Sequence, residues 1–160
     1  NMPDLFRNNP YAGELKDPLL YDVPEEYKEA DSKFAAMLEE AEKFLGYPYV
    51  WGGSDPSTSF DCSGFVSWVL VNSGVKDVGR LGATSLYGTL TPVREDEARP
   101  GDIIFFEGTL GEGVEGNDGI THCGIYVGDG MMIHCGSPIS YADLSRSYWQ
   151  EHFYGYARAY

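Results

Sequence analysis

The residues with the clearest chemical potential in this chain are one cysteine and two histidines. Cys62 lies in the string DCSG, directly before apolar residues at helical spacing, which predicts that it sits in the first turn of a helix. Backbone N–H groups there have no intrahelical partner, and a helix N-terminus lowers the pKa of a thiol. A nucleophilic thiol also needs a base, and the only candidates are His122, His134 and His152. A buried structural cysteine is the alternative interpretation of Cys62.

His122 and His134 lie on two expected strands that flank the turn sequence at residues 128–130. A three-residue loop would pair Val127 with Met131 and place both imidazoles on one face of the sheet, about 7–8 Å apart at the backbone. A loop one residue shorter would turn them to opposite faces. We therefore expect Cys62 as nucleophile, His122 as its general base and His134 as the residue that orients His122. For His134, an ordinary strand histidine is the alternative.

The pattern around these residues predicts helices first and antiparallel strands afterwards. Apolar residues at steps of three and four indicate one amphipathic helix, and a second helix begins at the cysteine. The later segments alternate in the way of strands and end in an aromatic closing strand. The expected elements are helices at 27–45 and 62–72, and strands at 102–106, 121–128, 131–136 and 151–160.

Composition excludes several classes of function. The chain has 160 residues, enough for one compact domain, and a net charge of −14, which disfavours binding to nucleic acid or to anionic membrane surfaces. No apolar run is long enough for membrane insertion, and the start lacks the pattern of a signal peptide. The 3 cysteines match no zinc motif, so we expect no metal and no cofactor. Cys123 and Cys135 are expected to face each other across two strands, as reduced thiols or, alternatively, as a disulfide.

Three ordered strings carry a resemblance to a known family. YPYVWGGSDPSTSFDCSGFVSWVL, RPGDIIFF and THCGIYVGDGMMIH resemble the NlpC family of bacterial cell-wall cysteine endopeptidases, over about residues 33–160. The resemblance implies an α+β, papain-like fold, with N-terminal helices packed on a central antiparallel β-sheet. It also implies a triad of Cys62, His122 and His134. The implied activity is peptidoglycan hydrolysis in the stem peptide, between D-glutamate and the following diamino acid, which is meso-diaminopimelate or L-lysine.

The resemblance further implies which residues line the substrate groove. These are Tyr49 and Trp51 in YVWGG, and Asp61 and Ser63 beside the nucleophile. For the two aromatic residues the alternative is a place in the core, and for the two polar residues it is a helix cap. His152 has no motif around it and is interpreted as a surface residue.

The remaining expectations concern organisation and partners. Residues 1–26 read as an N-terminal extension or interdomain linker, and residues 27–160 as the NlpC-like peptidase domain. The implied partner is the peptidoglycan stem peptide, and the implied location is extracellular or in the cell wall, with an upstream wall-acting domain as an open option. The rival functions are a related amidase or acyltransferase with the same Cys-His pair, and a non-catalytic wall-binding module. The acidic, glycine-rich segment 107–119 is expected to be an exposed loop, as a solvated insertion or a flap over the substrate.

Overall fold

A six-stranded antiparallel sheet forms the centre of the molecule. The computed structural model describes residues 17–160, so the first part of the expected N-terminal extension, residues 1–16, lies outside the described residues. The helices are α2 (Glu25–Ala30), α3 (Ser32–Glu42), α4 (Cys62–Asn72), α5 (Ala83–Thr89) and α6 (Ser147–His152), with a short 3-10 helix at Glu95–Glu97. The strands are β1 (Ser54–Asp55), β2 (Ser59–Phe60), β3 (Thr91–Val93), β4 (Ile103–Glu107), β5 (Ile120–Gly128), β6 (Met131–Cys135), β7 (Ile139–Asp143) and β8 (Phe153–Arg158).

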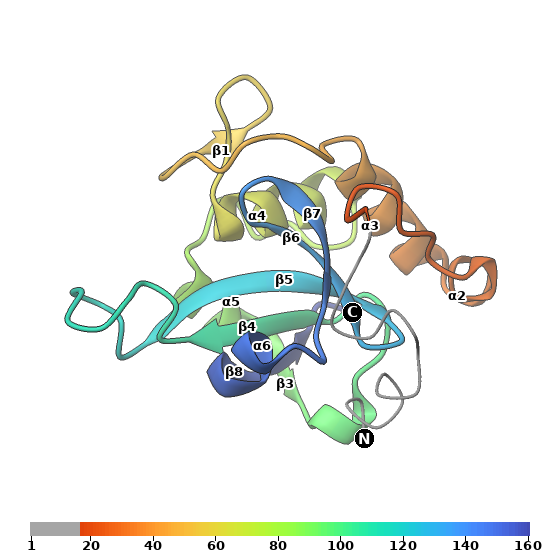
Figure 1. The fold of residues 1–160 in the computed structure, drawn as a ribbon. Helices are drawn as coiled ribbons and strands as arrows, with labels where there is room; N and C mark the ends of the chain where they lie inside the picture. Colours follow the sequence, from red (N-terminus) through yellow and green to blue (C-terminus); the bar gives the residue numbers. More distant parts are fainter. Residues whose placement is uncertain (1–16) are drawn as a thin grey trace.

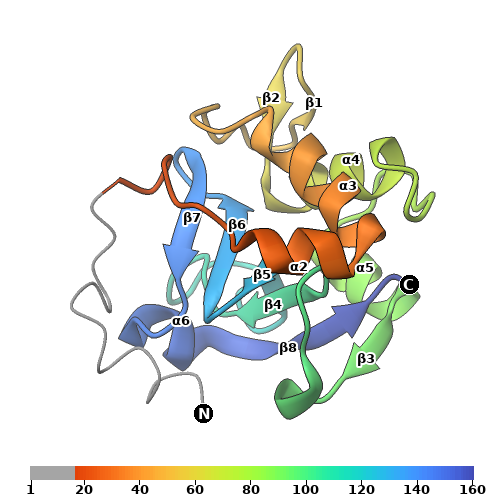
Figure 2. The ribbon, with the colours of Figure 1, turned by 90° about the vertical axis from the view of Figure 1, so that its right-hand side faces the viewer.

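The strand order places the two histidine-bearing strands beside each other. The large sheet runs β3-β8-β4-β5-β6-β7, while β1 and β2 form a separate hairpin. Figures 1 and 2 show α3 and α4 on one side of β5 and β6, with α6 on the other side. The fold is therefore the expected one, with N-terminal helices packed on a central antiparallel sheet.

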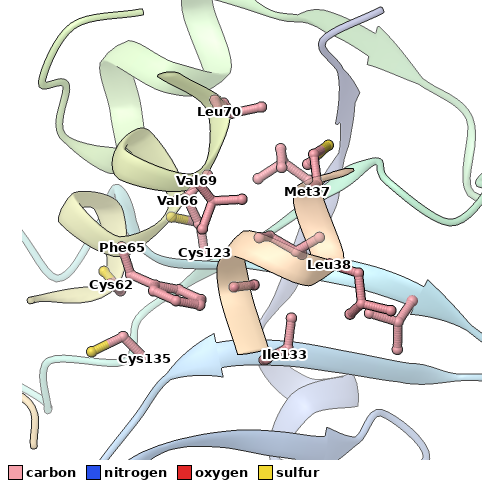
Figure 3. Close-up of a cluster of buried hydrophobic side chains, with 14 of the residues drawn as sticks. Met37, Leu38, Cys62, Phe65, Val66, Val69, Leu70, Cys123, Ile133 and Cys135 are labelled. Atoms are coloured by element: carbon pink, nitrogen blue, oxygen red, sulfur yellow. The ribbon is translucent and has the colours of Figure 1, made fainter. Parts of the chain in front are cut away.

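Each face of the sheet has its own core, as the alternation of strand side chains requires. The face under α3 and α4 is the larger, and Figure 3 shows side chains of both helices meeting those of the sheet there. The opposite face carries a smaller cluster that includes residues of β4, β6 and β8, against which α6 packs. Among the buried members of the first cluster are Phe34, Met37, Leu38, Phe65, Val66, Leu70, Phe105, Cys123, Ile125 and Ile133, and those of the second are Ile104, Phe106, Met132, Leu144 and Tyr156.

The single helix expected over residues 27–45 is wrong, because the chain breaks at Asp31. Asp31 has an extended backbone, with φ −146° and ψ 100°, and its carboxylate accepts hydrogen bonds from the N–H groups of Lys33 and Phe34. The hydroxyl of Tyr160 donates to the same carboxylate at 2.7 Å. An aspartate that caps a helix N-terminus competes with helix continuation. The apolar periodicity spans the break because α2 and α3 both pack on the domain.

The turn between β5 and β6 is one residue shorter than expected. Gly128 pairs with Met131, which leaves only Asp129 and Gly130 in the loop. Both loop residues have positive φ, 53° and 72°, as the tight hairpin turns that match strand twist require. The expected three-residue loop, with Val127 opposite Met131, is therefore wrong.

A β-bulge nevertheless restores the register that the chemistry needs. Tyr126 pairs with Met132, so Val127 is an extra residue between this pair and the turn. The shift cancels the effect of the shorter loop, and the register beyond the bulge is the expected one. His122 and His134 therefore share a face of the sheet.

Several elements were not expected from the sequence: α5, α6, β1, β2, β3, β7 and the 3-10 helix. Each is short, and β7 alternates in burial in the manner of an edge strand. The described part of the extension also contacts the domain, since Val23 is buried and Tyr21 packs on Tyr141 with ring centroids 5.2 Å apart. Short segments of this kind carry too few periodic positions for a pattern to identify them.

We predict that Gly128→Ala destabilises the protein by more than about 1 kcal/mol in urea unfolding, because alanine is strained at positive φ. Gly128 has φ 89°, and a Cβ there would lie 2.7 Å from a ring carbon of Tyr27. Gly88→Ala is the matched control. Gly88 lies in helix α5, and a Cβ at this residue would meet nothing within 4 Å. Equal stability of the two variants would contradict the prediction.

Candidate active site

Cys62 is the first residue of α4, as the sequence predicts. The helix begins here because the Asp61 carboxylate accepts a hydrogen bond from the N–H of Gly64 at 2.8 Å, which satisfies one of the unpaired donors of the first turn. The Cys62 side chain is 6% exposed, and its sulfur lies 3.9 Å from the carbonyl oxygen of Thr121 on β5. The thiol is thus held between a helix N-terminus and the strand that carries His122.

The glycine of DCSG lets a loop cross the first turn of α4. A Cβ on Gly64 would lie 2.1 Å from the carbonyl oxygen of Gly53, closer than any side-chain carbon could approach. The same carbonyl accepts a hydrogen bond from the N–H of Asp61 at 3.0 Å. This contact places the loop that carries Tyr49 and Trp51 beside the nucleophile.

His122 and His134 form a directly hydrogen-bonded pair. Nε2 of His122 lies 2.8 Å from Nδ1 of His134, and the two rings are nearly perpendicular, at 86°. The side chains are 9% and 6% exposed. Because His134 occupies Nε2 of His122, the nitrogen left to meet the thiol of Cys62 is Nδ1. The structure therefore brings together all three residues expected in the triad.

The pKa of the Cys62 thiol is lowered well below its usual range. The largest cause is a side-chain hydrogen bond from Cys123, and a hydrogen bond and the charge of His122 act in the same direction. Burial and the negative charge of Asp61 oppose the shift. The thiolate form is consequently favoured, and the pKa of Cys123, the donor, is raised well above its usual range.

His134 is held neutral. Burial lowers its pKa well below the usual value, and the charge of His122 lowers it further. A neutral imidazole has one nitrogen without a proton, which can accept a hydrogen bond. Nδ1 of His134 can thus accept from Nε2–H of His122, which orients the His122 ring.

Cys123 and Cys135 are free, buried thiols in the structure. They have different surroundings, because Cys123 contacts Cys62 whereas Cys135 donates to the carbonyl oxygen of Phe60 at 3.2 Å. Burial raises the pKa of Cys135 to about 12, so it stays protonated. Figure 3 shows all three cysteines among the side chains of the larger core.

The two aromatic residues of YVWGG have different environments. Trp51 is 76% exposed, so it is not a core residue. Tyr49 is half-buried against the larger core, and its hydroxyl oxygen faces the backbone N–H of Cys62. Burial is the main cause that raises the pKa of Tyr49, so its hydroxyl keeps its proton as a donor. Their expected role in the groove stays a prediction.

Asp61 and Ser63 are tied to an arginine that the sequence analysis did not single out. The guanidinium of Arg80 donates to Asp61 Oδ1 at 2.8 Å and to Ser63 Oγ at 2.9 Å. Asp61 also accepts from the N–H of Gly52 at 3.1 Å, in addition to capping α4. Asp61 is therefore a helix cap, as its alternative interpretation holds, and a link between the loop and α4. Arg80 follows α4 without any surrounding pattern, so its only signal was a positive charge in an acidic chain.

His152 lies apart from the histidine pair. Its Nδ1 is 2.8 Å from the carbonyl oxygen of Glu107. Within residues 17–160, no cluster of three His, Cys, Asp or Glu side chains has the arrangement of a metal site. In the same part of the chain, no helix combines the length and the apolar character needed to span a membrane.

A thiol at a helix N-terminus, facing two imidazoles on an antiparallel sheet, defines the molecule as a papain-like α+β domain. The chain belongs to the NlpC/P60 family, whose family model matches residues 46–158.

Relatives of known name and structure agree with this membership. The bifunctional muramidase/DL-endopeptidase CwlT of Bacillus subtilis (strain 168) is 42% identical over 126 residues, which are 78% of this chain and 36% of CwlT. The probable endopeptidase p60 of Listeria seeligeri is 41% identical over 123 residues, 76% of this chain and 21% of p60. The crystal structure of a lipoprotein-like NLP/P60 family protein from Staphylococcus aureus subsp. aureus Mu50 superposes with TM-score 0.72 at 40% identity, over 81% of this chain and 42% of that one. The chain thus spans only 36% and 21% of the two curated relatives.

We predict that Asp61→Ala lowers the free energy of unfolding by about 1–2 kcal/mol in urea titrations, because the cap of α4 is lost. Asp61→Asn is the matched variant, since asparagine caps a helix equally well but cannot form the ion pair with Arg80. It should lose much less stability. If both variants lose the same amount, the ion pair and not the cap is the stabilising contact.

We predict that stability falls below about pH 6.5 because of His134. The pKa of His134 is lower in the folded protein than in the unfolded chain, so the unfolded chain binds a proton more readily. Stability is therefore lost as the pH falls from the unfolded pKa towards the folded pKa. The slope for one such group is at most about 1.4 kcal/mol per pH unit. Urea unfolding between pH 7.5 and 5 should show a shallower loss in His134→Gln, and identical slopes would contradict the assignment.

Proposed function

We propose that this domain is a peptidoglycan hydrolase, a cysteine endopeptidase that cleaves stem peptides between D-glutamate and the following diamino acid. The observation that carries the proposal is the hydrogen-bonded array in which Cys62 meets His122, and His122 meets His134 at 2.8 Å. The names of related proteins support the substrate class. One further relative, the gamma-DL-glutamyl hydrolase of Bacillus subtilis (strain 168), is 33% identical over 89% of this chain and 30% of its own length.

In the first step, the Cys62 thiolate attacks the carbonyl carbon of the scissile amide and a C–S bond forms. His122 then donates its Nδ1 proton to the amide nitrogen, the C–N bond breaks and the amine leaves. His122 next takes a proton from a water molecule, which attacks the thioester carbonyl, and the C–S bond breaks to return the thiolate. Throughout the cycle, neutral His134 accepts from Nε2–H of His122 and keeps the ring in place.

The developing oxyanion has two donors beside the sulfur. The backbone N–H of Cys62 points out of the first turn of α4, and the hydroxyl of Tyr49 faces the same N–H. Because both groups are donors next to the nucleophile, we infer that the carbonyl oxygen of an attacked amide binds between them, in place of the contact that the N–H makes with the Tyr49 oxygen. A donor of this kind is worth about 3–4 kcal/mol in the transition state.

The groove next to the nucleophile offers groups suited to a stem peptide. Arg80 is 36% exposed and holds a guanidinium beside Ser63, which suits a substrate carboxylate. Trp51 is exposed on the neighbouring loop and offers a flat apolar surface. Action on the wall implies an extracellular or wall location, and the greater length of the relatives fits an upstream wall-acting domain in the complete protein.

The test is digestion of a purified muropeptide with a defined stem, with mass spectrometry to locate the new amine. We expect a free amine on the diamino acid, and Cys62→Ala should abolish the product because no other group replaces the sulfur nucleophile. Cys135→Ala is the matched control, as it removes a buried thiol on β6 that lies outside the array, and it should retain activity.

Other outcomes would identify the rival functions. Cleavage at the lactyl amide would indicate an amidase, and transfer of the acyl group to an added amine would indicate an acyltransferase. Binding of muropeptide without any product from the wild-type protein would indicate a wall-binding module. An active Cys62→Ala protein would refute the nucleophile.

A further inference from the structure

One indole covers both histidines of the array. The ring of Trp149 on α6 is stacked on His122, with centroids 5.6 Å apart and an interplanar angle of 23°. The same ring meets the ring of His134 edge to face, at 5.1 Å and 86°. Phe106 on β4 packs against Trp149 at 4.8 Å and against His122 at 5.9 Å. The sequence analysis did not single out Trp149, because no chemical motif surrounds it.

The helix that carries Trp149 is tied to the sheet at several points. The amide Nε2 of Gln150 donates to the carbonyl oxygen of Leu144, and Nδ1 of His152 is 2.8 Å from the carbonyl oxygen of Glu107 at the end of β4. The indole also packs on the smaller core cluster. Trp149 is therefore placed by the fold, on the side of the sheet opposite α4.

The position of the indole has two physical consequences. A cation over an aromatic face is stabilised by the ring quadrupole, and the imidazolium of His122 lies against that face. The indole also occupies space beside the hydrogen bond between His122 and His134, and a hydrogen bond is stronger where water is excluded. The first effect stabilises a positive charge on the His122 ring whenever the ring carries one, and the second holds the ring in the orientation that meets Cys62.

We propose that Trp149 is a positioning residue of the active site, whose indole fixes the His122 ring and shields its hydrogen bond to His134 from water. The proposal rests on the proposed function for its catalytic meaning. It concerns a residue that touches the general base and not the substrate.

Other titratable groups surround His122 and must be constant in any test. Cys62 and Asp61 come from the start of α4, His134 comes from β6, and Cys123 adjoins His122 on β5. The elements packed against this face carry further groups: Glu107 ends β4, and Tyr148, Glu151 and His152 lie on α6. A substitution of Trp149 alone leaves all of these groups in place.

The experiment measures alkylation of Cys62 by iodoacetamide as a function of pH, with mass spectrometry of the Cys62 peptide as the readout. The rate follows the thiolate and changes again when the paired imidazolium loses its proton, so it reports the Cys62–His122 pair without any peptidoglycan. The variants are Trp149→Leu and Trp149→Met, which lack an aromatic face, and Trp149→Phe, which keeps one. Tyr154→Leu is the matched control, since Tyr154 is an exposed aromatic residue of the adjoining strand that packs on Tyr87.

We expect the upper transition to move down by about one pH unit in the Leu and Met variants, because the imidazolium loses its stabilisation. The Phe variant should shift less, and the control should not shift. For stem-peptide cleavage, the alkaline limb of kcat/KM should move in the same direction, with the loss in kcat and not in KM. The near-UV circular dichroism spectrum identifies which variants are folded.

The outcomes separate this inference from the proposed function. A folded Leu or Met variant with an unchanged upper transition overturns the role of Trp149, while the wild-type profile still supports the thiolate–imidazolium pair. A wild-type protein whose Cys62 alkylates as an ordinary thiol, with one transition near pH 8.5, overturns the proposed function itself. An equal shift in the Phe and Leu variants would also overturn the inference, because an aromatic face would then make no difference.

Discussion

The hydrogen bond between His122 and His134 constrains the whole sheet, because both rings must lie on one face of adjacent strands. Side chains alternate along a strand, so a slip of one residue between β5 and β6 would separate the rings. The turn at residues 129–130 taken alone would cause such a slip, and the extra residue Val127 cancels it. The shorter turn and the bulge therefore occur together. Gly128 lies between them and has a positive φ, a conformation that glycine adopts without strain.

The start of α4 places the sulfur of Cys62 beside the pair of histidines. Asp61 ends the extended segment and caps the helix, and the absence of a side chain at Gly64 admits the loop that brings Tyr49 and Trp51 to the site. The Asp61 carboxylate has an electrostatic cost, since its charge raises the pKa of Cys62. Its ion pair with Arg80 offsets part of that charge, so one contact serves both the helix and the thiolate.

The site lies where the two cores of the sheet meet. Cys62 belongs to the larger cluster under α3 and α4, whereas the histidine rings pack against Phe106 and Trp149 on the opposite face. The buried surroundings keep His134 uncharged, so that its Nδ1 can accept a hydrogen bond from Nε2–H of His122. The histidine rings therefore lie in apolar packing on one face of the sheet, while Cys62 receives its hydrogen bonds on the other face.

The sequence by itself determined the helix at Cys62 and the main strands, because hydrophobic periodicity and turn residues act over a few positions. The shared face of the histidines depends on the bulge at Val127, which no sequence pattern indicated. The sequence also did not determine the helix break at Asp31, the two-residue loop at 129–130 or the contacts of Asp61 with Arg80 and Gly52. At each of these positions several local conformations are possible, and contacts with distant parts of the chain select one of them. Arg80 and Trp149 reach the site from distant segments through single contacts, and a contact between distant segments leaves no period in the sequence. Only the tertiary structure decided the places of Arg80 and Trp149 in the site, because these places follow from how the helices and the sheet pack together.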